Sequence, residues 1–164
     1  QPKNPLNVYG QSKLLGERLL LAKSQKYYLI RTSGLFGRHG KNFVETILRL
    51  AREGKELKVV NDQHFKPTFT LDLAGKTREL IESDSPFGIY HLTNEGATTW
   101  YDLAKEVFRV LPRVVLLPCS SYQFPRPAKR PKHSVLLNTK LPLLRPWKKA
   151  LKEYLEYYGR QASR

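Results

Sequence analysis

Tyr9 and Lys13 are the side chains of this 164-residue sequence whose types and spacing first suggest chemistry. They lie four positions apart, so on a helix both would project from the same face. An ammonium group beside a phenol favours the phenolate, and such a phenol can donate a proton to a forming alkoxide. The spacing alone is weak, because a chain this rich in Tyr and Lys contains about one such match by chance. Tyr101 and Lys105 form a second match, so the surrounding sequence has to distinguish the two.

The first pair lies in a segment that predicts a helix over residues 8–24. Asn7 precedes it and is a typical N-cap residue. Gly10 and Ser12 are small, which lets another backbone or a cofactor approach the pair closely. An apolar stripe at helical spacing is formed by Leu14, Leu15, Leu19 and Leu20. The second pair lies in a helix whose Leu103, Val107 and Phe108 read as core, which favours a structural role there.

The rest of the chain alternates between strand-like and helix-like segments. Strands are predicted over residues 27–33, 57–60, 88–92 and 114–117. Helices are predicted over 43–51, 72–81, 100–111 and 147–158. Gly54 is expected to end the first of these helices, Pro112 the third and Gly159 the fourth. Residues 34–40, 61–64 and 124–132 read as loops. The alternation predicts an α/β fold with parallel strand pairing.

Composition describes a globular chain with an anionic partner. The sequence is 40% hydrophobic, and its net charge of +15 favours nucleic acid, a membrane surface or a phosphorylated small molecule as partner. Its single cysteine, Cys119, excludes an internal disulfide, fits a reducing cytoplasm and reads as a small buried or half-buried thiol. No apolar run approaches the roughly 18 residues of a membrane span. Because the sequence contains no methionine, we expect a piece of a longer reading frame or a processed product.

Short motifs with a recognisable order lie along the chain, at residues 7–13, 30–33, 40–44, 60–63, 66–68, 72–74, 88–94, 127–131 and 147–151. In this order they resemble one branch of the extended short-chain dehydrogenase/reductase family, the dTDP-4-dehydrorhamnose reductases. The resemblance covers the chain essentially from end to end, but it corresponds to the carboxy-terminal half of such a protein.

The resemblance implies an activity and a set of site residues. Hydride would pass from NADPH or NADH to C4 of a 4-keto-6-deoxy sugar on thymidine diphosphate, giving dTDP-rhamnose. Tyr9 would be the general acid, and Lys13 would hold the cofactor ribose. The turn formed by Thr32, Ser33, Gly34 and Leu35 would border the nicotinamide. The sugar nucleotide would be bound by Asn42, Gln63, Thr68 and Arg130.

Each of the substrate assignments has a plainer alternative. Asn42 could serve simply as a helix cap, and the two roles are compatible. For Gln63 and Thr68 the structural and binding roles remain equally open. Arg130 belongs to a proline-interrupted basic cluster that could be a solvated loop or a clamp for a diphosphate; its other members are Arg126, Lys129 and Lys132. Mg²⁺ is compatible with the resemblance, but the four histidines, His39, His64, His91 and His133, show no metal-binding spacing.

Two departures from the family pattern bear on fold and substrate. Gly34 stands where members of the family often carry a bulky aromatic, which leaves the identity of the sugar open. Gly34, Gly37 and Gly40 do not have the spacing of a dinucleotide fingerprint, so we expect no normal binding of the cofactor pyrophosphate by these residues. The predicted fold is therefore a partial Rossmann-like parallel sheet with the smaller sugar-nucleotide-binding region. Residues 1–164 would be the carboxy-terminal part of a single reductase unit, without its amino-terminal dinucleotide-binding half.

Three alternatives to this reductase remain. One is a non-catalytic regulatory subunit on the same scaffold, similar to the β subunit of methionine adenosyltransferase. Another is a different sugar-nucleotide reductase or epimerase. A nucleic-acid module would suit the charge, but the aromatic residues occupy apolar positions and are not interleaved with basic ones, which argues against it. We expect a cytoplasmic protein without membrane contact, and a homodimer is compatible with the resemblance.

Overall fold

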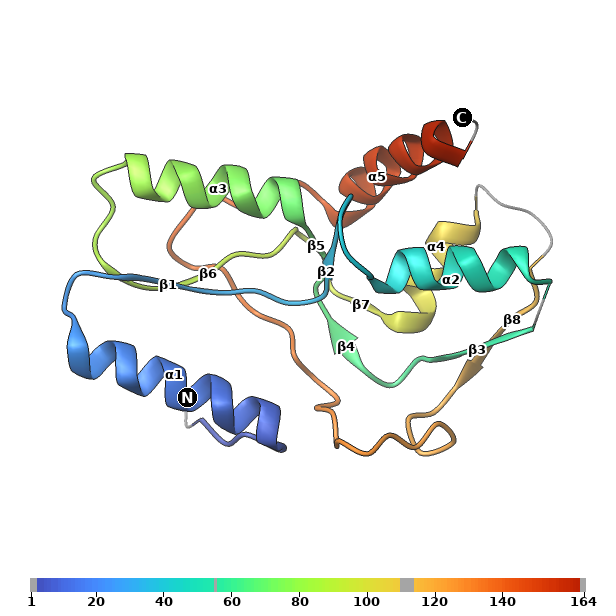
Figure 1. Ribbon diagram of the computed structural model, residues 1–164, viewed down its shortest axis with the longest axis horizontal. Helices are drawn as coiled ribbons and strands as arrows, with labels where there is room; N and C mark the ends of the chain where they lie inside the picture. The colour runs from blue at the N-terminus through green and yellow to red at the C-terminus, as the bar shows by residue number, and fades with distance from the viewer. Residues whose placement is uncertain (1–2, 55, 110–113, 163–164) are drawn as a thin grey trace.

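The computed structural model describes residues 3–54, 56–109 and 114–162 as helices, short strands and connecting loops (Figure 1). The helices are α1 (Val8–Lys23), α2 (Phe43–Arg52), α3 (Thr70–Glu82), α4 (Trp100–Phe108) and α5 (Trp147–Ala162). The strands are β1 (Tyr28–Arg31), β2 (Leu35–Phe36), β3 (Leu57–Val60), β4 (His64–Phe65), β5 (Thr68–Phe69), β6 (Gly88–His91), β7 (Thr98–Thr99) and β8 (Leu116–Cys119).

Strand pairing follows the parallel pattern that the alternation of elements predicts. β1 pairs with β6 from Tyr28↔Gly88 to Arg31↔His91, and β3 pairs with β8 from Leu57↔Leu116 to Val60↔Cys119. β2 and β5 are parallel as well, whereas β4 and β7 are antiparallel. The α/β fold class is confirmed.

Two groups of elements surround these strands. Figure 1 shows the β1–β6 pair between α1 and α3, while α2, α4 and α5 gather around the remaining strands. The second group holds the main hydrophobic core, because the apolar faces of its three helices meet there. Its buried members include Val44 and Ile47 of α2, Leu103 and Val107 of α4, and Leu151 of α5.

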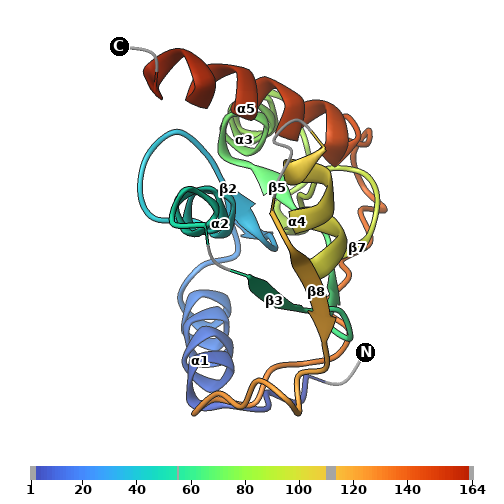
Figure 2. The same cartoon turned by 90° about the vertical axis from the view of Figure 1, so that its right-hand side faces the viewer.

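α1 contrasts with the other helices because none of its sixteen residues is buried. Two leucines of its predicted apolar stripe, Leu15 and Leu19, are each 56% exposed. The helix is therefore positioned chiefly by polar contacts with neighbouring segments. Figure 2 shows α1 together with the loop that follows β8, at the end of the molecule opposite α5.

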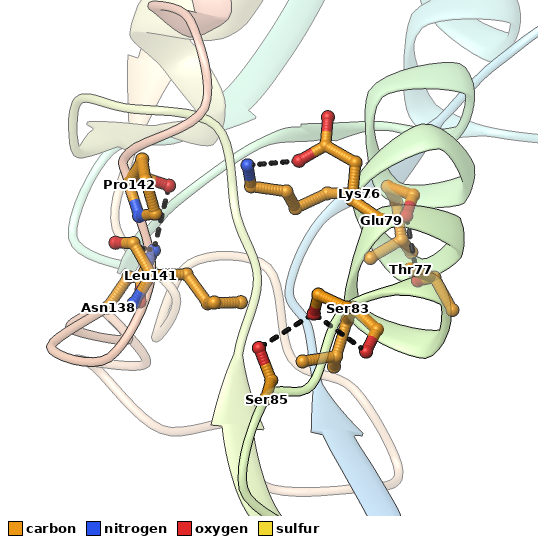
Figure 3. Close-up of polar contacts among 10 residues, drawn as sticks. Lys76, Thr77, Glu79, Ser83, Ser85, Asn138, Leu141 and Pro142 are labelled. Carbon is orange, nitrogen blue, oxygen red and sulfur yellow. Dashed lines mark hydrogen bonds and ion pairs between the residues drawn. The ribbon is translucent and has the colours of Figure 1, made fainter.

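α3 and the segment after it are fixed by short-range polar contacts (Figure 3). Thr77 donates a hydrogen bond to the Leu73 carbonyl (2.7 Å), and the hydroxyls of Ser83 and Ser85 lie 2.8 Å apart where the helix gives way to β6. Across from them, Asn138 Nδ2 donates to the Leu141 carbonyl oxygen (3.0 Å) and closes a turn. These contacts shape the surface beside β6 without involving any predicted site residue.

Several predicted boundaries are wrong. α3 begins at Thr70 and not at Asp72, because β5 leads directly into it and Asp72 lies in its first turn. β8 begins two residues later than predicted, where the ladder with β3 starts. Gly159 does not end α5: it lies within the helix, since Arg160, Gln161 and Ala162 are good helix formers and continue it. The stop expected at Pro112 lies outside the described residues.

Candidate active site

The first predicted pair occupies the opening turns of α1. Asn7 caps the helix by accepting a hydrogen bond from the Gly10 backbone N–H (2.8 Å), as the sequence predicts. Lys13 then lies over the ring of Tyr9, with its Nζ atom 5.3 Å from the ring centroid. Tyr9 is 70% exposed, so its ring is open to a ligand. A cation held against an accessible phenol is an arrangement suited to proton transfer.

The second pair has different surroundings. Tyr101 is half-buried and packs against the hydrophobic core, while Leu103 and Val107 on the same helix are fully part of it. Lys105 is exposed. This is the structural role that the sequence favoured for Tyr101 and Lys105.

A network of ionic contacts joins α1 to β1. Glu17 receives both prongs of the Arg31 guanidinium, at 2.7 Å from Nε and 2.6 Å from Nη2, and also contacts Lys3 Nζ at 2.6 Å. The hydrogen bonds from Arg31, aided by those from Lys3 and opposed by partial burial, lower the pKa of Glu17 to about 2. Arg31 also lies 3.4 Å from the His91 ring nitrogen on β6. Sequence reasoning missed this network, because Glu17 looked like an ordinary polar residue of an exposed helix face.

The turn predicted to border a nicotinamide follows directly on Arg31. It runs from the carboxyl end of β1 into β2, which is where ligands lie in open parallel sheets. The hydroxyl of Thr32 is buried and has no hydrogen-bond partner among the described residues. A buried hydroxyl normally finds a partner, so Thr32 is a candidate for a polar contact with a ligand, but the ligand would reach it only after the turn moves.

The geometry of this turn accounts for the glycine at position 34, where family members often carry a bulky aromatic residue. Its φ of +55° is left-handed, and a Cβ atom there would lie 2.4 Å from Cε2 of Phe65. The Phe65 ring in turn stacks on Trp100, with their centroids 3.9 Å apart. An aromatic side chain beside Gly34 is therefore supplied by β4 and not by the residue after Ser33.

A cavity of about 430 Å³ lies between α2, β3, the start of α4 and the loop after β8. Gln63 and Arg130, two of the predicted substrate residues, both line it. Among the described residues that line it, the cations are Lys58, Arg126 and Arg130, and none is a carboxylate. Its aromatic members are Phe43, Trp100 and Phe124, of which Phe43 and Trp100 have ring centroids 4.7 Å apart. Flat apolar walls beside several cations suit an aromatic base carrying phosphates.

Some of these residues were not recognised from the sequence. Lys58, Phe43 and Trp100 looked like ordinary members of a strand and two helices, and they become site candidates because three elements converge. Arg126 belongs to the proline-interrupted basic cluster, and this cluster is the feature of the sequence that points to it as a site residue. A larger hollow of about 530 Å³ runs along α3, but its lining contains none of the predicted site residues.

Asn42 and Thr68, the other two predicted substrate residues, do not line this cavity. The Asn42 side chain caps α2 through the Glu45 N–H (3.1 Å) and donates to the Gly37 carbonyl (3.1 Å). Its amide is therefore already engaged by the fold. Thr68 is fully buried in β5, and its hydroxyl has no partner among the described residues. A ligand would reach that hydroxyl only after the strands around it move.

Within the part of the chain that the structure describes, no group of three or more His, Cys, Asp or Glu could hold a metal ion. His64 and His133 stack with their ring centroids 5.1 Å apart, and their backbones form an isolated parallel bridge between β4 and the loop after β8. Cys119 is a buried free thiol, as predicted, and burial raises its pKa. Of the described helices, none has the length and apolar character needed to cross a bilayer.

The fold is an α/β region of the kind found in extended short-chain dehydrogenases/reductases. Comparison with known proteins gives the particular family. The family model described as "RmlD substrate binding domain" matches residues 1–160. The chain belongs to this family.

Relatives and solved structures agree with this assignment. A dTDP-4-dehydrorhamnose reductase of Streptomyces griseus is 41% identical over 164 residues, covering 93% of this chain and 54% of that protein. The crystal structure of a dTDP-4-dehydrorhamnose reductase from Clostridium acetobutylicum matches with a TM-score of 0.91 and 42% identity, over 97% of this chain and 58% of that one. A Bacillus anthracis enzyme of the same name, solved in complex with NADP, matches with a TM-score of 0.88 and 34% identity, over 94% and 57% of the two chains. This chain thus spans about half the length of the relatives it matches.

Proposed function

We propose that the protein containing this chain is a nicotinamide-dependent reductase of a dTDP-linked 4-keto-6-deoxy sugar, with dTDP-4-dehydrorhamnose as substrate and dTDP-rhamnose as product. The observation that carries the proposal is the Tyr9–Lys13 contact on a helix joined, through Glu17 and Arg31, to the strand before the Thr32–Leu35 turn. The reductase relatives add weight to this choice of reaction.

The cofactor end of the site would be formed by α1 and the turn after β1. Exposed Lys13 can donate to ribose hydroxyls, and Thr32 would offer its hydroxyl, which has no partner among the described residues, once the turn moves to uncover it. These groups fit the nicotinamide riboside of NADPH or NADH. When bound, the reduced nicotinamide supplies the hydride that adds to C4 of the sugar. Ser33, Gly34 and Leu35 would complete the border of the ring.

Tyr9 has the acid's role in this scheme. As the C4 carbonyl gains a hydride, its oxygen becomes an alkoxide, and the Tyr9 hydroxyl gives that oxygen its proton. The Lys13 ammonium group stabilises the phenolate that remains, because a cation close to a phenolate lowers its free energy. A positioned general acid of this kind contributes about 10²–10⁴-fold to the rate.

The sugar nucleotide would occupy the cavity beside α2. Arg130, Arg126 and Lys58 supply positive charge for the diphosphate, and Arg side chains can hold two phosphate oxygens at once. Trp100 and Phe43 offer flat apolar surfaces for the thymine base, and Gln63 offers neutral hydrogen bonds. Asn42 would act from outside the cavity by fixing the start of α2, and Thr68 by packing within β5.

The test is a reductase assay on the full-length protein. Oxidation of NADPH and NADH is followed with dTDP-4-dehydrorhamnose, and dTDP alone serves as the competing ligand. Turnover that dTDP inhibits supports the proposal. Cofactor binding without turnover of any keto-sugar contradicts it and favours a regulatory subunit on the same scaffold. The coding sequence upstream of Gln1 gives an independent check, since a glycine fingerprint after a strand is expected there.

A further inference from the structure

Asn7 makes two contacts with a single side-chain amide. Its Oδ1 atom accepts from the Gly10 N–H (2.8 Å) and caps α1, the helix that carries Tyr9. Its Nδ2 atom donates to the Lys129 carbonyl oxygen at 2.7 Å, across 122 positions of sequence. One residue thus joins the start of α1 to the loop that follows β8.

That loop carries two of the cations of the cavity. Lys129 is the immediate neighbour of Arg130, and Arg126 lies three residues before Lys129. The loop is fixed at its beginning by Ser121, whose backbone N–H and hydroxyl donate to Asp62 at 2.9 and 2.8 Å. It is fixed at its end by backbone hydrogen bonds between His64 and residues Lys132 (2.7 Å) and Ser134 (2.8 Å). Residues 122–131 between these anchors are exposed, and the Asn7 contact falls in this stretch.

The chemistry of the amide explains why asparagine suits this position. Ser, Thr and Asp can cap a helix because each has an acceptor oxygen. An asparagine side chain provides that acceptor and, on the same planar group, an N–H donor for a carbonyl. Aspartate would direct a second acceptor at the Lys129 carbonyl oxygen, and serine would leave that carbonyl without its partner.

We propose that Asn7 is a positioning residue that holds the 122–131 loop, and with it Arg126 and Arg130, in a fixed relation to the Tyr9 helix. The inference rests on the proposed function, in which these arginines bind the diphosphate and Tyr9 protonates the sugar oxygen. Placing both ends of one substrate correctly requires that the two segments keep their separation, and misplacement by about 1 Å is costly in enzymes. Because coupling is reciprocal, a ligand on the arginines also stabilises the start of α1 through Asn7.

The test uses Asn7→Ser and Asn7→Asp in the full-length protein, since both keep a cap acceptor and remove the donor to Lys129. We expect the KM for the dTDP-sugar, and the Kd for dTDP alone, to rise roughly three- to tenfold, the equivalent of about one hydrogen bond. The KM for the cofactor and the thermal midpoint should stay close to wild type. Amide hydrogen exchange in residues 122–131 should become faster. Asn4→Ser, at an exposed position three residues earlier, is the matched control and should change none of these quantities.

Two results would overturn the inference. One is Asn7→Ser with unchanged loop exchange and an unchanged KM for the dTDP-sugar. The other is a fall in thermal midpoint that accounts for all loss of activity, which is the behaviour of a helix cap alone. If the wild-type protein turns over no keto-sugar, the proposed reaction fails, and the Asn7 inference is then decided by loop exchange and dTDP binding. Unchanged values of both in Asn7→Ser would exclude the coupling.

Discussion

Glu17 and Arg31 form a two-pronged ion pair, with Arg31 Nε 2.7 Å from Oε1 and Nη2 2.6 Å from Oε2 of Glu17. The pair joins α1, which buries none of its residues, to the last residue of β1. Tyr9, Lys13 and Glu17 follow one another at intervals of four on the helix, so one face carries the proposed proton donor, the cation beside it and the carboxylate that binds Arg31. The residue after Arg31 is Thr32, the first of the predicted cofactor turn.

The first prediction concerns the pH dependence of this anchor. Glu17 has its pKa lowered from 4.5 to about 2, so the pair contributes its full stability above pH 4.5 and loses it as the pH falls through 2. Because the side chains are 16% and 28% exposed, we expect Glu17→Gln to cost about 1–2 kcal/mol at pH 7. Urea unfolding of both full-length proteins should show this difference shrinking between about pH 4.5 and 2. A difference that is the same at pH 7 and at pH 2 would contradict the ion-pair account. Glu82→Gln, in the exposed pair with Arg78, should change little at either pH.

The second prediction separates the two roles of Asn42. Asn42→Ala removes the cap of α2 and the contact with Gly37, and should lower the free energy of unfolding by about 1–3 kcal/mol. Asn42→Ser keeps a cap acceptor and should lose clearly less. If capping is the whole role, the KM for the sugar nucleotide stays at the wild-type value in Asn42→Ser. A raised KM in that variant, at unchanged stability, would instead identify Asn42 as a ligand.

The third prediction concerns Gly34. Asn, Asp or Gly suits a φ of +55°, but any Cβ there would collide with Phe65 at 2.4 Å. Gly34→Ala should therefore destabilise the protein by about 2–5 kcal/mol, from the left-handed backbone and the collision together. Gly40→Ala is the matched control, because Gly40 also has a positive φ of 78° but nothing within 4 Å of the added carbon. It should cost about 1–2 kcal/mol. Equal losses of unfolding free energy in the two variants would show that Phe65 moves aside.

Local signals of the sequence were enough for much of this fold. The caps Asn7 and Asn42 and the stop at Gly54 act within a few residues of themselves, so the starts of α1 and α2 and the end of α2 follow from sequence. The predicted end of α5 at Gly159 is wrong. A glycine ends a helix when it takes up a left-handed conformation, whereas here the helix-forming residues that follow it continue the helix. The two-residue strands β2, β4, β5 and β7 were missed, since pairings that short carry no periodicity.

In the candidate site, too, contacts set by local spacing could be predicted from the sequence and contacts between distant segments could not. The Tyr9–Lys13 contact is set by helical spacing and could be predicted. Contacts between distant segments, such as Glu17 with Arg31 and Asn7 with Lys129, could not be predicted, because no local pattern encodes them. The same holds for the convergence of Trp100 and Arg130 on one cavity. Gln63 and Arg130 came from the resemblance and lie on one cavity. Asn42 and Thr68 came from the same source, yet their side chains face the interior of the fold.

The most direct measurement of the central claim is the turnover of Tyr9→Phe in the full-length protein with NADPH, NADH and dTDP-4-dehydrorhamnose. The ring stays in place under Lys13 while the proton is lost, so we expect kcat to fall by about 10²–10⁴-fold with cofactor affinity little changed. Tyr101→Phe removes the hydroxyl of the second Tyr-x-x-x-Lys match and should retain wild-type turnover. Turnover of Tyr9→Phe within a few-fold of wild type would contradict the assignment of Tyr9 as the general acid.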